Sequence, residues 1–213
     1  MSSSVISKLQ PNYLDKSELH NNILVVKKLN CINNPKKLNI NLTFLEKTIT
    51  NIFKKERKNR LLAKLLSKLE WQNNLTILIL SFSSIDEIEY INSCDKTTLD
   101  IVGVDLSLSK LKKIDKKYRN KLDISLIGCC AQDLPFLDEQ FDIILNIGSF
   151  NHYTNRTKAT KEMLRVTKDG GKILLADKLD DSNKLKDEII NVTTNYTQDV
   201  LSEENYYYYI ISK

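Results

Sequence analysis

No apolar run in the sequence is long enough to cross a bilayer, so its pattern is not that of a membrane-spanning protein. The first residues, MSSSVISKLQP, lack an apolar segment, and we expect no secretory signal there. The 4 cysteines show no Cys-x-x-Cys spacing, which argues against a zinc site. Reduced thiols in a cytoplasmic protein without a bound metal are therefore expected.

The length of 213 residues is enough for one sizeable core and an appendage. The positive charge is concentrated at the N-terminus: residues 1–70 hold 14 Lys+Arg and 5 Asp+Glu, while the remainder holds 18 and 22. Solvated helix faces explain this excess, and contact with nucleic acid is the alternative explanation. Because the basic residues are scattered with few aromatics between them, we favour the first.

The N-terminal third shows one helical pattern. Thr43 and Glu46 have the spacing of a capping box, and apolar residues recur at helical spacing through residues 45–69. Before that pattern, residues 21–29 fit either a short helix or a strand. We therefore expect residues 1–70 to form an N-terminal helical extension or lid.

Residues 71–213 alternate Ile- and Leu-rich runs with amphipathic segments, which predicts a doubly wound α/β sheet. The expected strands are 75–82, 99–104, 124–127, 141–147 and 172–176. The expected helices are 85–92, 107–121, 157–167 and 182–190. A closing antiparallel hairpin is expected over 192–200 and 206–211, where β-forming residues are frequent.

One stretch, Cys129 to Asp142, reads CCAQDLPFLDEQFD and lies between two expected strands. It resembles the central signature of class I S-adenosylmethionine (SAM) dependent methyltransferases, above all the small-molecule branch with the ubiquinone and menaquinone C-methyltransferases. The matching positions are Ala131, Gln132, Leu134, Pro135, Phe136, Phe141 and Asp142, followed by Glu162 to Val166 and Gly170 to Lys172.

The resemblance implies a seven-stranded Rossmann-like sheet with the last strand inserted antiparallel between the fifth and sixth. It also implies SAM as the cofactor and a small-molecule methyl acceptor. Under this interpretation the N-terminal helices form a cap over the carboxyl ends of the strands and line the acceptor pocket.

Asp105 directly follows the second expected strand. A carboxylate at the carboxyl end of a strand in a doubly wound sheet can accept both ribose hydroxyls of a nucleoside. The family resemblance gives this position the same role. The alternative is that Asp105 caps the next helix, in competition with Ser107.

The loop after the first expected strand departs from the family, which has an acid and a glycine-rich turn there. This chain has neither, and Ile79 stands at the position of the acid. Ser81 and Ser83 offer hydroxyls in its place, and the start of the next helix offers free amides for the methionine carboxylate.

The adenine side is expected to involve the backbone of Ala131 and the side chain of Gln132, with Cys130 beside them and Leu106 over one face of the ring. Cys130 is a weak hydrogen-bond acceptor, and a small buried side chain is the simpler interpretation.

The segment that leaves the fourth strand starts at Asn146, a further candidate for cofactor binding, and lines the acceptor pocket in the family. His152 is the candidate general base if the acceptor is a hydroxyl or an acidic carbon. A histidine that orients the loop or faces solvent is the alternative.

Two other functions stay open. The missing glycine loop fits a catalytically silent methyltransferase-like subunit that binds or regulates a protein partner. The basic N-terminal third fits an RNA methyltransferase, although no Asn-Pro-Pro-Tyr-type motif follows the fourth expected strand.

Overall fold

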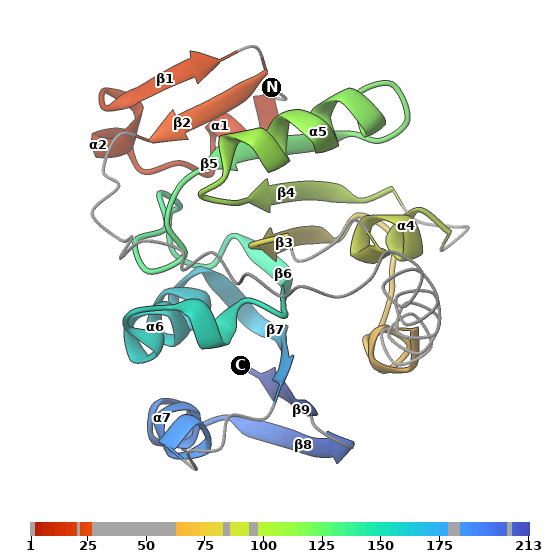
Figure 1. Cartoon of the computed structure of the whole chain (residues 1–213), viewed down its shortest axis with the longest axis vertical. Coiled ribbons are helices and arrows are strands. Elements are labelled where there is room, and N and C mark those ends of the chain that lie inside the picture. Colours follow the sequence, from red (N-terminus) through yellow and green to blue (C-terminus); the bar gives the residue numbers. More distant parts are fainter. Residues whose placement is uncertain are drawn as a thin grey trace, which may run out of the picture.

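The structure, a computed structural model, describes residues 3–20, 22–26, 63–82, 86–93, 98–178, 184–203 and 206–213. These residues form one nine-stranded sheet in the order β1-β2-β5-β4-β3-β6-β7-β9-β8 (Figure 1). The strands are β1 (Ser17–His20), β2 (Ile23–Val26), β3 (Thr76–Leu80), β4 (Asp100–Val104), β5 (Ile124–Gly128), β6 (Phe141–Ile147), β7 (Thr167–Lys178), β8 (Thr197–Glu203) and β9 (Tyr206–Ser212). The helices are α1 (Ser3–Ile6), α2 (Pro11–Leu14), α4 (Asp86–Ser93), α5 (Leu108–Tyr118), η1 (Phe150–His152), α6 (Arg156–Val166) and α7 (Lys184–Thr193).

The inner strands are apolar on both faces. β3 reads TILIL, and all five of its residues are buried. It pairs in parallel with β4 on one side and β6 on the other, with Leu78 opposite Val102 and Ile144. Strands covered on both faces need apolar side chains at odd and even positions alike. The predicted α/β sheet is therefore confirmed.

The strand order reverses between β3 and β6. From β3 the chain continues outward through β4 and β5, and it then returns to β6 and continues the other way through β7. Sheets of this kind bind ligands in the crevice beyond the carboxyl ends of the strands at this switch point. The residues that follow β3 and β6 are therefore the first place to look for a site.

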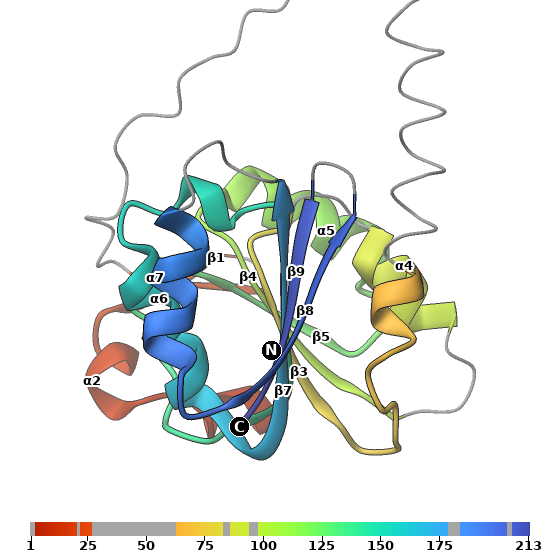
Figure 2. The ribbon, with the colours of Figure 1, turned by 90° about the horizontal axis from the view of Figure 1, so that it is seen from below.

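Helices cover both faces of the sheet, which Figure 2 shows edge-on. One face packs against α4 and α5 through residues such as Ile88 and Leu111. The other packs against α6 and α7 through Met163 and Ile189, and against the N-terminal helices. The sheet is thus enclosed as a parallel sheet requires, and its two core clusters share no residue.

The number of strands corrects the prediction, because the sheet has nine strands and not seven. The additional pair is the antiparallel hairpin of β1 and β2, and β2 pairs in parallel with β5. Residues 23–26, which fitted either a helix or a strand, are a strand because this edge of the sheet accepts them.

The predicted N-terminal helical cap is not confirmed, since α1, α2 and the hairpin flank and extend the sheet. The capping box of Thr43 and Glu46, and most of the helical pattern of residues 45–69, lie outside the described residues. Of that pattern, residues 63–66 are helical, and Leu66 is fully buried.

The last strand lies antiparallel between β7 and β8, as the resemblance predicted. Its tyrosine run serves both cores: Tyr207 and Tyr209 belong to one cluster, while Tyr206 and Tyr208 pack with the other. The alternation of a strand and burial on both sides account for the run without an aromatic cage.

The strand expected over residues 172–176 is longer in the structure, because β7 begins at Thr167 and passes through Gly170 and Gly171. The pairing with β6 shifts register between Phe141 and Ile143, and Gly170 has a φ of 77°. Glycine adopts this left-handed conformation without the strain that a Cβ would cause.

The N-terminal helices are fixed to the segment before β6. The backbone N–H of Gln10 donates to the carbonyl of Pro135 at 2.8 Å, and that of Leu137 donates to the carbonyl of Lys8 at 2.7 Å. The Tyr13 hydroxyl donates to Asp133 Oδ1 at 2.6 Å. These contacts, together with a bridge between Leu9 and Phe136, make α1 and α2 part of the main core.

Tyr13 gives a prediction about pH. Burial, and then the hydrogen bond to the Asp133 carboxylate, raise the pKa of the Tyr13 phenol above its ordinary value of about 10. Above that pH the unfolded chain loses this proton while the folded protein keeps it, so the free energy of unfolding falls as pH rises. One such proton contributes a slope of up to about 1.4 kcal/mol per pH unit.

From pH 9 to pH 11, the free energy of unfolding should fall by about 1 kcal/mol less in Tyr13→Phe than in the native protein. Urea unfolding at both pH values would measure the difference. Tyr118→Phe, at another phenol whose pKa burial raises, should show a reduced loss in the same direction. Equal losses in the native protein and Tyr13→Phe would contradict the assignment to Tyr13.

Within the described ranges, none of the helices is both long and apolar enough to span a membrane.

Candidate functional site

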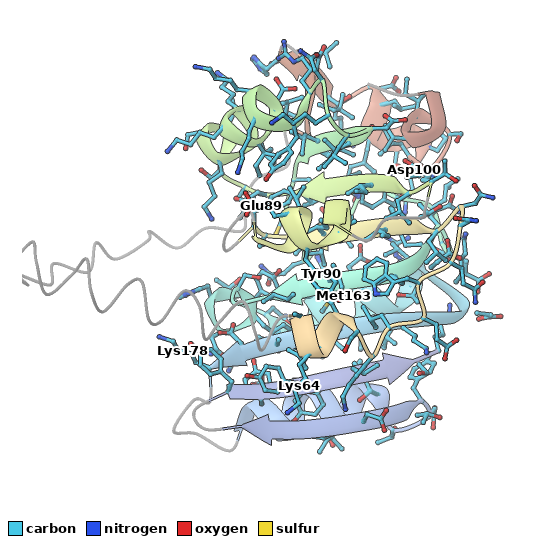
Figure 3. All side chains as sticks on the ribbon, turned by 90° about the vertical axis from the view of Figure 1, so that its right-hand side faces the viewer. Lys64, Glu89, Tyr90, Asp100, Met163 and Lys178 are labelled. Atoms are coloured by element: carbon cyan, nitrogen blue, oxygen red, sulfur yellow. The ribbon has the colours of Figure 1, made fainter. Side chains whose placement is uncertain are left out.

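The candidate site lies at the edge of the sheet where the parallel strands end. Figure 3 labels Asp100, where β4 begins, and Lys178, where β7 ends, at opposite edges of the sheet. The predicted site residues follow β3, β4, β5 and β6 at the edge marked by Lys178. The topology therefore brings together segments that lie far apart in the sequence.

Asp105 directly follows β4 and is only 5% exposed. Its Oδ1 accepts the backbone N–H of Ser107 at 2.7 Å, while Ser107 itself is the N-cap of α5. Ser107, and not Asp105, therefore caps α5, while Asp105 holds the backbone of that cap residue. Its Oδ2 faces an amino group and leaves acceptor capacity for a ligand.

That amino group belongs to Lys110, a residue that the sequence interpretation missed. Its Nζ lies 3.4 Å from Asp105 Oδ2 and donates to the carbonyl of Phe82 at 3.1 Å. The Lys110 side chain is 53% exposed, so it can leave Asp105 at little cost in desolvation. A lysine in the first turn of α5, five residues after the site carboxylate, was the available signal.

Ser81 follows β3 and has a φ of 57°, in the left-handed region. Its N–H donates to the carbonyl of Val104 at 2.7 Å, which fixes this turn against β4. The backbone therefore has the conformation that favours glycine, although the residue is serine. Ile79 is buried in the core, and Ser83 lies outside the described residues.

Phe82 turns away from the crevice into the core beside α4 and α5. A Cβ built at Gly103 would lie 2.4 Å from the Phe82 ring, so the ring packs directly on the backbone of β4. The ring therefore points away from the candidate site. The backbone carbonyl of Phe82 lies at the site and accepts a hydrogen bond from Lys110 Nζ.

The left-handed turn predicts a stability difference between two variants of Ser81. A residue with a Cβ is strained in this region by about 1–2 kcal/mol, and glycine costs about 0.5–1 kcal/mol in chain entropy. We therefore expect Ser81→Gly to be more stable than Ser81→Ala by about 0.5–1 kcal/mol. Both variants lose the hydroxyl, so urea unfolding of the pair isolates the backbone term. Equal stabilities would mean that the turn is relaxed.

Cys130, Ala131 and Gln132 follow β5 and are all buried. Gln132 Oε1 accepts the N–H of Asn155 at 2.7 Å and the hydroxyl of Thr154 at 3.0 Å. The Gln132 side chain thus holds the segment before α6. Because its oxygen already accepts two hydrogen bonds, the contact of Gln132 with adenine stays a prediction. Leu106, half-buried after Asp105, is positioned at the same edge.

Asn146 is fully buried near the end of β6. Its Nδ2 donates to the Tyr153 hydroxyl at 3.0 Å, and its Oδ1 accepts the Ser149 hydroxyl at 2.6 Å. Tyr153 was missed by the sequence interpretation, since its partners lie on two different strands. Its contact with Ser81 joins the ends of β3 and β6 across the switch point.

His152 is exposed at the end of η1. The turn is held by Asp177, whose Oδ2 accepts the N–H of Asn151 at 2.9 Å, and by the Asn151 amide, which donates to the carbonyl of Lys178. The loop position of His152 is therefore fixed from β7, while its imidazole is accessible from solvent.

The comparisons with known proteins agree with this arrangement. Residues 88–175 match the family model described as a methyltransferase domain. The demethylmenaquinone methyltransferase of Renibacterium salmoninarum is 42% identical over 79 residues, which are 37% of this chain and 32% of that protein. The ubiquinone/menaquinone biosynthesis C-methyltransferase of Geotalea daltonii is 27% identical over 115 residues, which are 52% of this chain and 48% of that protein. This chain thus spans less than half the length of either relative.

A SAM-dependent methyltransferase from Aquifex aeolicus has a similar solved structure, with a TM-score of 0.57, 14% identity, and coverage of 71% of this chain and 88% of that one. At this identity the likeness concerns the fold. The resemblance predicted from the sequence is confirmed at the level of the fold and of one segment: the chain has the fold of SAM-dependent methyltransferases, and its residues 88–175 match a methyltransferase domain.

Proposed function

We propose that this chain is a SAM-dependent methyltransferase that acts on a small molecule. The observation that carries the proposal is Asp105, a buried carboxylate at the carboxyl end of β4 beside the switch point. It lies inside residues 88–175, the segment that matches a methyltransferase domain. Relatives named for steps in menaquinone and ubiquinone biosynthesis support a small-molecule acceptor.

The described residues fit the nucleoside part of SAM. Asp105 Oδ2 can accept ribose hydroxyls once Lys110 moves away, and charge-assisted hydrogen bonds of this kind are strong. Backbone groups around Ala131 and the side chain of Leu106 flank the same edge and would hold the adenine. When bound, SAM supplies a methyl group activated by a positively charged sulfur.

On the acceptor side, the chain contributes positioning and proton transfer. The clamp of Asp177 and Asn151 fixes η1, and alignment of the reacting atoms accounts for much of the rate in a displacement reaction. His152 would accept the proton of an acceptor hydroxyl or acidic carbon as the acceptor takes the methyl group.

A second candidate is a catalytically silent subunit of the same fold. It is favoured by the apolar Ile79 at the end of β3 and by Lys110, whose ammonium already faces Asp105. An RNA acceptor stays a further prediction, and filter binding at two salt concentrations would test it, since contacts with phosphates weaken as salt rises.

Calorimetric titration with SAM and with S-adenosylhomocysteine, up to millimolar ligand, tests the proposal. We expect a Kd in the tens of micromolar or weaker, equivalent to about −6 kcal/mol, because the family's acid and glycines are replaced. A methylated product in the presence of a demethylquinone would support the enzyme. No binding at millimolar ligand would leave the silent subunit.

We also propose that residues 1–70 are an extension of the domain of residues 71–213 and not an independent unit. The pairing of β2 with β5 and the burial of Val5 and Tyr13 in the main core support this division. A fragment of residues 1–70 that unfolds cooperatively by itself would contradict it. The buried thiol of Cys130 supports a cytoplasmic location, which cell fractionation would test.

A further inference from the structure

The Tyr153 hydroxyl lies at the switch point and contacts residues from both strands that flank it. It is 3.3 Å from Ser81 Oγ, which follows β3, and 3.0 Å from Asn146 Nδ2, which lies in β6. It is also 3.4 Å from Ser149 Oγ. One phenol therefore joins the ends of β3 and β6 at the switch point, where sheets of this kind bind their ligand.

The donors and acceptors in this cluster can be assigned. Ser149 donates its one proton to Asn146 Oδ1 at 2.6 Å, and Asn146 Nδ2 donates to the Tyr153 oxygen. Ser149 can then only accept from Tyr153, so the phenol proton points to it. Ser81 must in turn donate to Tyr153. The Ser81 oxygen keeps its lone pairs for a further donor.

The cluster has a buried half and an accessible half. Asn146 is 0% exposed and Ser149 8% exposed, whereas Ser81 and Tyr153 are each partly exposed. The buried pair orients the accessible pair, and Phe150 contacts the Tyr153 ring edge-on at 5.7 Å. Part of the Tyr153 side chain is exposed, but its hydroxyl is buried among Ser81, Asn146 and Ser149. This burial raises the pKa of the phenol, so the group stays protonated and the cluster is neutral.

The amino-acid end of SAM carries an ammonium group, which needs acceptors or an aromatic face. Two described carboxylates, one after β4 and one near the end of β7, are engaged: Asp105 accepts from Ser107 and faces Lys110, and Asp177 accepts the N–H groups of Asn151 and Lys178. The oxygen of Ser81 and the phenol of Tyr153 are placed between these two strands.

We propose that Ser81 and Tyr153 form a neutral subsite for the ammonium of the cofactor's amino-acid end. Ser81 Oγ accepts an N–H of the ammonium, and the Tyr153 oxygen and ring lie beside it. This inference rests on the proposed function. It assigns the contact with the ammonium to two uncharged side chains, because the position of the family's acid in β3 is taken by the buried Ile79. Tyr153 is a binding and positioning residue and takes no part in proton transfer.

Two ligands separate this role from a structural one. S-adenosylhomocysteine has the amino-acid end, whereas 5′-methylthioadenosine has the same nucleoside and thioether without it. Calorimetry of the native chain, Tyr153→Phe and Ser81→Gly should be run with both ligands. We expect each variant to bind S-adenosylhomocysteine about tenfold more weakly, as for one lost hydrogen bond to a charged group. Binding of 5′-methylthioadenosine should change by less than about twofold.

Matched controls address folding. Tyr118→Phe makes the same change on α5, where the hydroxyl meets Glu89, and should leave both affinities unchanged. Ser81→Ala also lacks the hydroxyl but should be less stable than Ser81→Gly, so equal weakening of binding in the two variants would show that stability does not cause the effect. Asp105→Ala should weaken both ligands together.

Equal weakening of both ligands by Tyr153→Phe, or no weakening of either, would overturn the subsite. If the native chain binds both ligands in those cases, the proposed function stands without it. If the native chain binds neither ligand, the proposed function fails and the subsite fails with it.

Discussion

Replacing Phe136 with alanine should lower the free energy of unfolding by about 3–5 kcal/mol. The Phe136 side chain is fully buried, and its ring meets Phe141 edge-on with centroids 4.9 Å apart. Truncation loses the transfer free energy of the ring and leaves a cavity. The effect is large because the N-terminal helices and the sheet share this part of the core.

The cavity at Phe136 has little freedom to collapse. The carbonyl of Phe136 accepts from Gln10 Nε2 at 2.8 Å and from the Arg165 guanidinium at 2.8 Å, so its backbone is fixed from two sides. Leu9 bridges to the same residue. The loss should therefore lie in the upper part of the expected range.

Urea unfolding of Phe136→Ala beside Leu137→Ala measures this effect. Leu137 is the next residue and is 39% exposed, so its truncation should cost less than about 0.5 kcal/mol. If Phe136→Ala unfolds outright, Phe136→Leu keeps most of the volume and gives a measurable intermediate. Similar losses at Phe136 and Leu137 would show that the N-terminal helices do not share the core.

The inner strands could be predicted because a strand buried on both faces has apolar residues at odd and even positions alike. Residues 75–82 have apolar side chains at odd and even positions, and β3 (Thr76–Leu80) lies within this range. The position of Asp105 followed in the same way, since the end of a buried strand in a doubly wound sheet faces the ligand edge. The local sequence pattern was sufficient for these features because each depends on the residues of one short segment.

The N-terminal hairpin and helices could not be predicted from local pattern. α1, α2, β1 and β2 have four residues each, too few for a helical or strand period to be recognised. They are held by distant partners: β2 pairs with β5, and Gln10 contacts Pro135. The number of strands was wrong for this reason.

Tyr153 and Lys110 were missed for a related reason. The hydrogen bond between Ser81 and Tyr153 joins residues 72 positions apart, and nothing in the sequence near Tyr153 indicates it. Lys110 was counted as part of the amphipathic helix expected over 107–121, although its amino group lies at Asp105. Residue types showed which chemistry was available, and the topology determined which groups meet.

Asp105→Ala should weaken binding of S-adenosylhomocysteine by about 1.5–3 kcal/mol, or about 10–150-fold, as for hydrogen bonds to a charged group. The ribose hydroxyls lose a buried acceptor, and the remaining contacts of the crevice cannot replace a carboxylate. The same variant removes the brace on the N–H of Ser107, so a moderate loss of stability accompanies the loss of binding.

Lys110→Met separates these two effects. Lys110 competes with the ribose for Asp105, so its removal should strengthen binding a few-fold, while the brace on Ser107 stays in place. Calorimetry of the native chain, Asp105→Ala and Lys110→Met, with thermal unfolding of each, gives both quantities. Asp115→Ala on α5 is the matched control, because it removes a buried, ion-paired carboxylate away from the switch point. Unchanged affinity in a folded Asp105→Ala variant would show that the nucleoside does not meet Asp105, and opposite shifts in the two variants would place the ribose between Asp105 and Lys110.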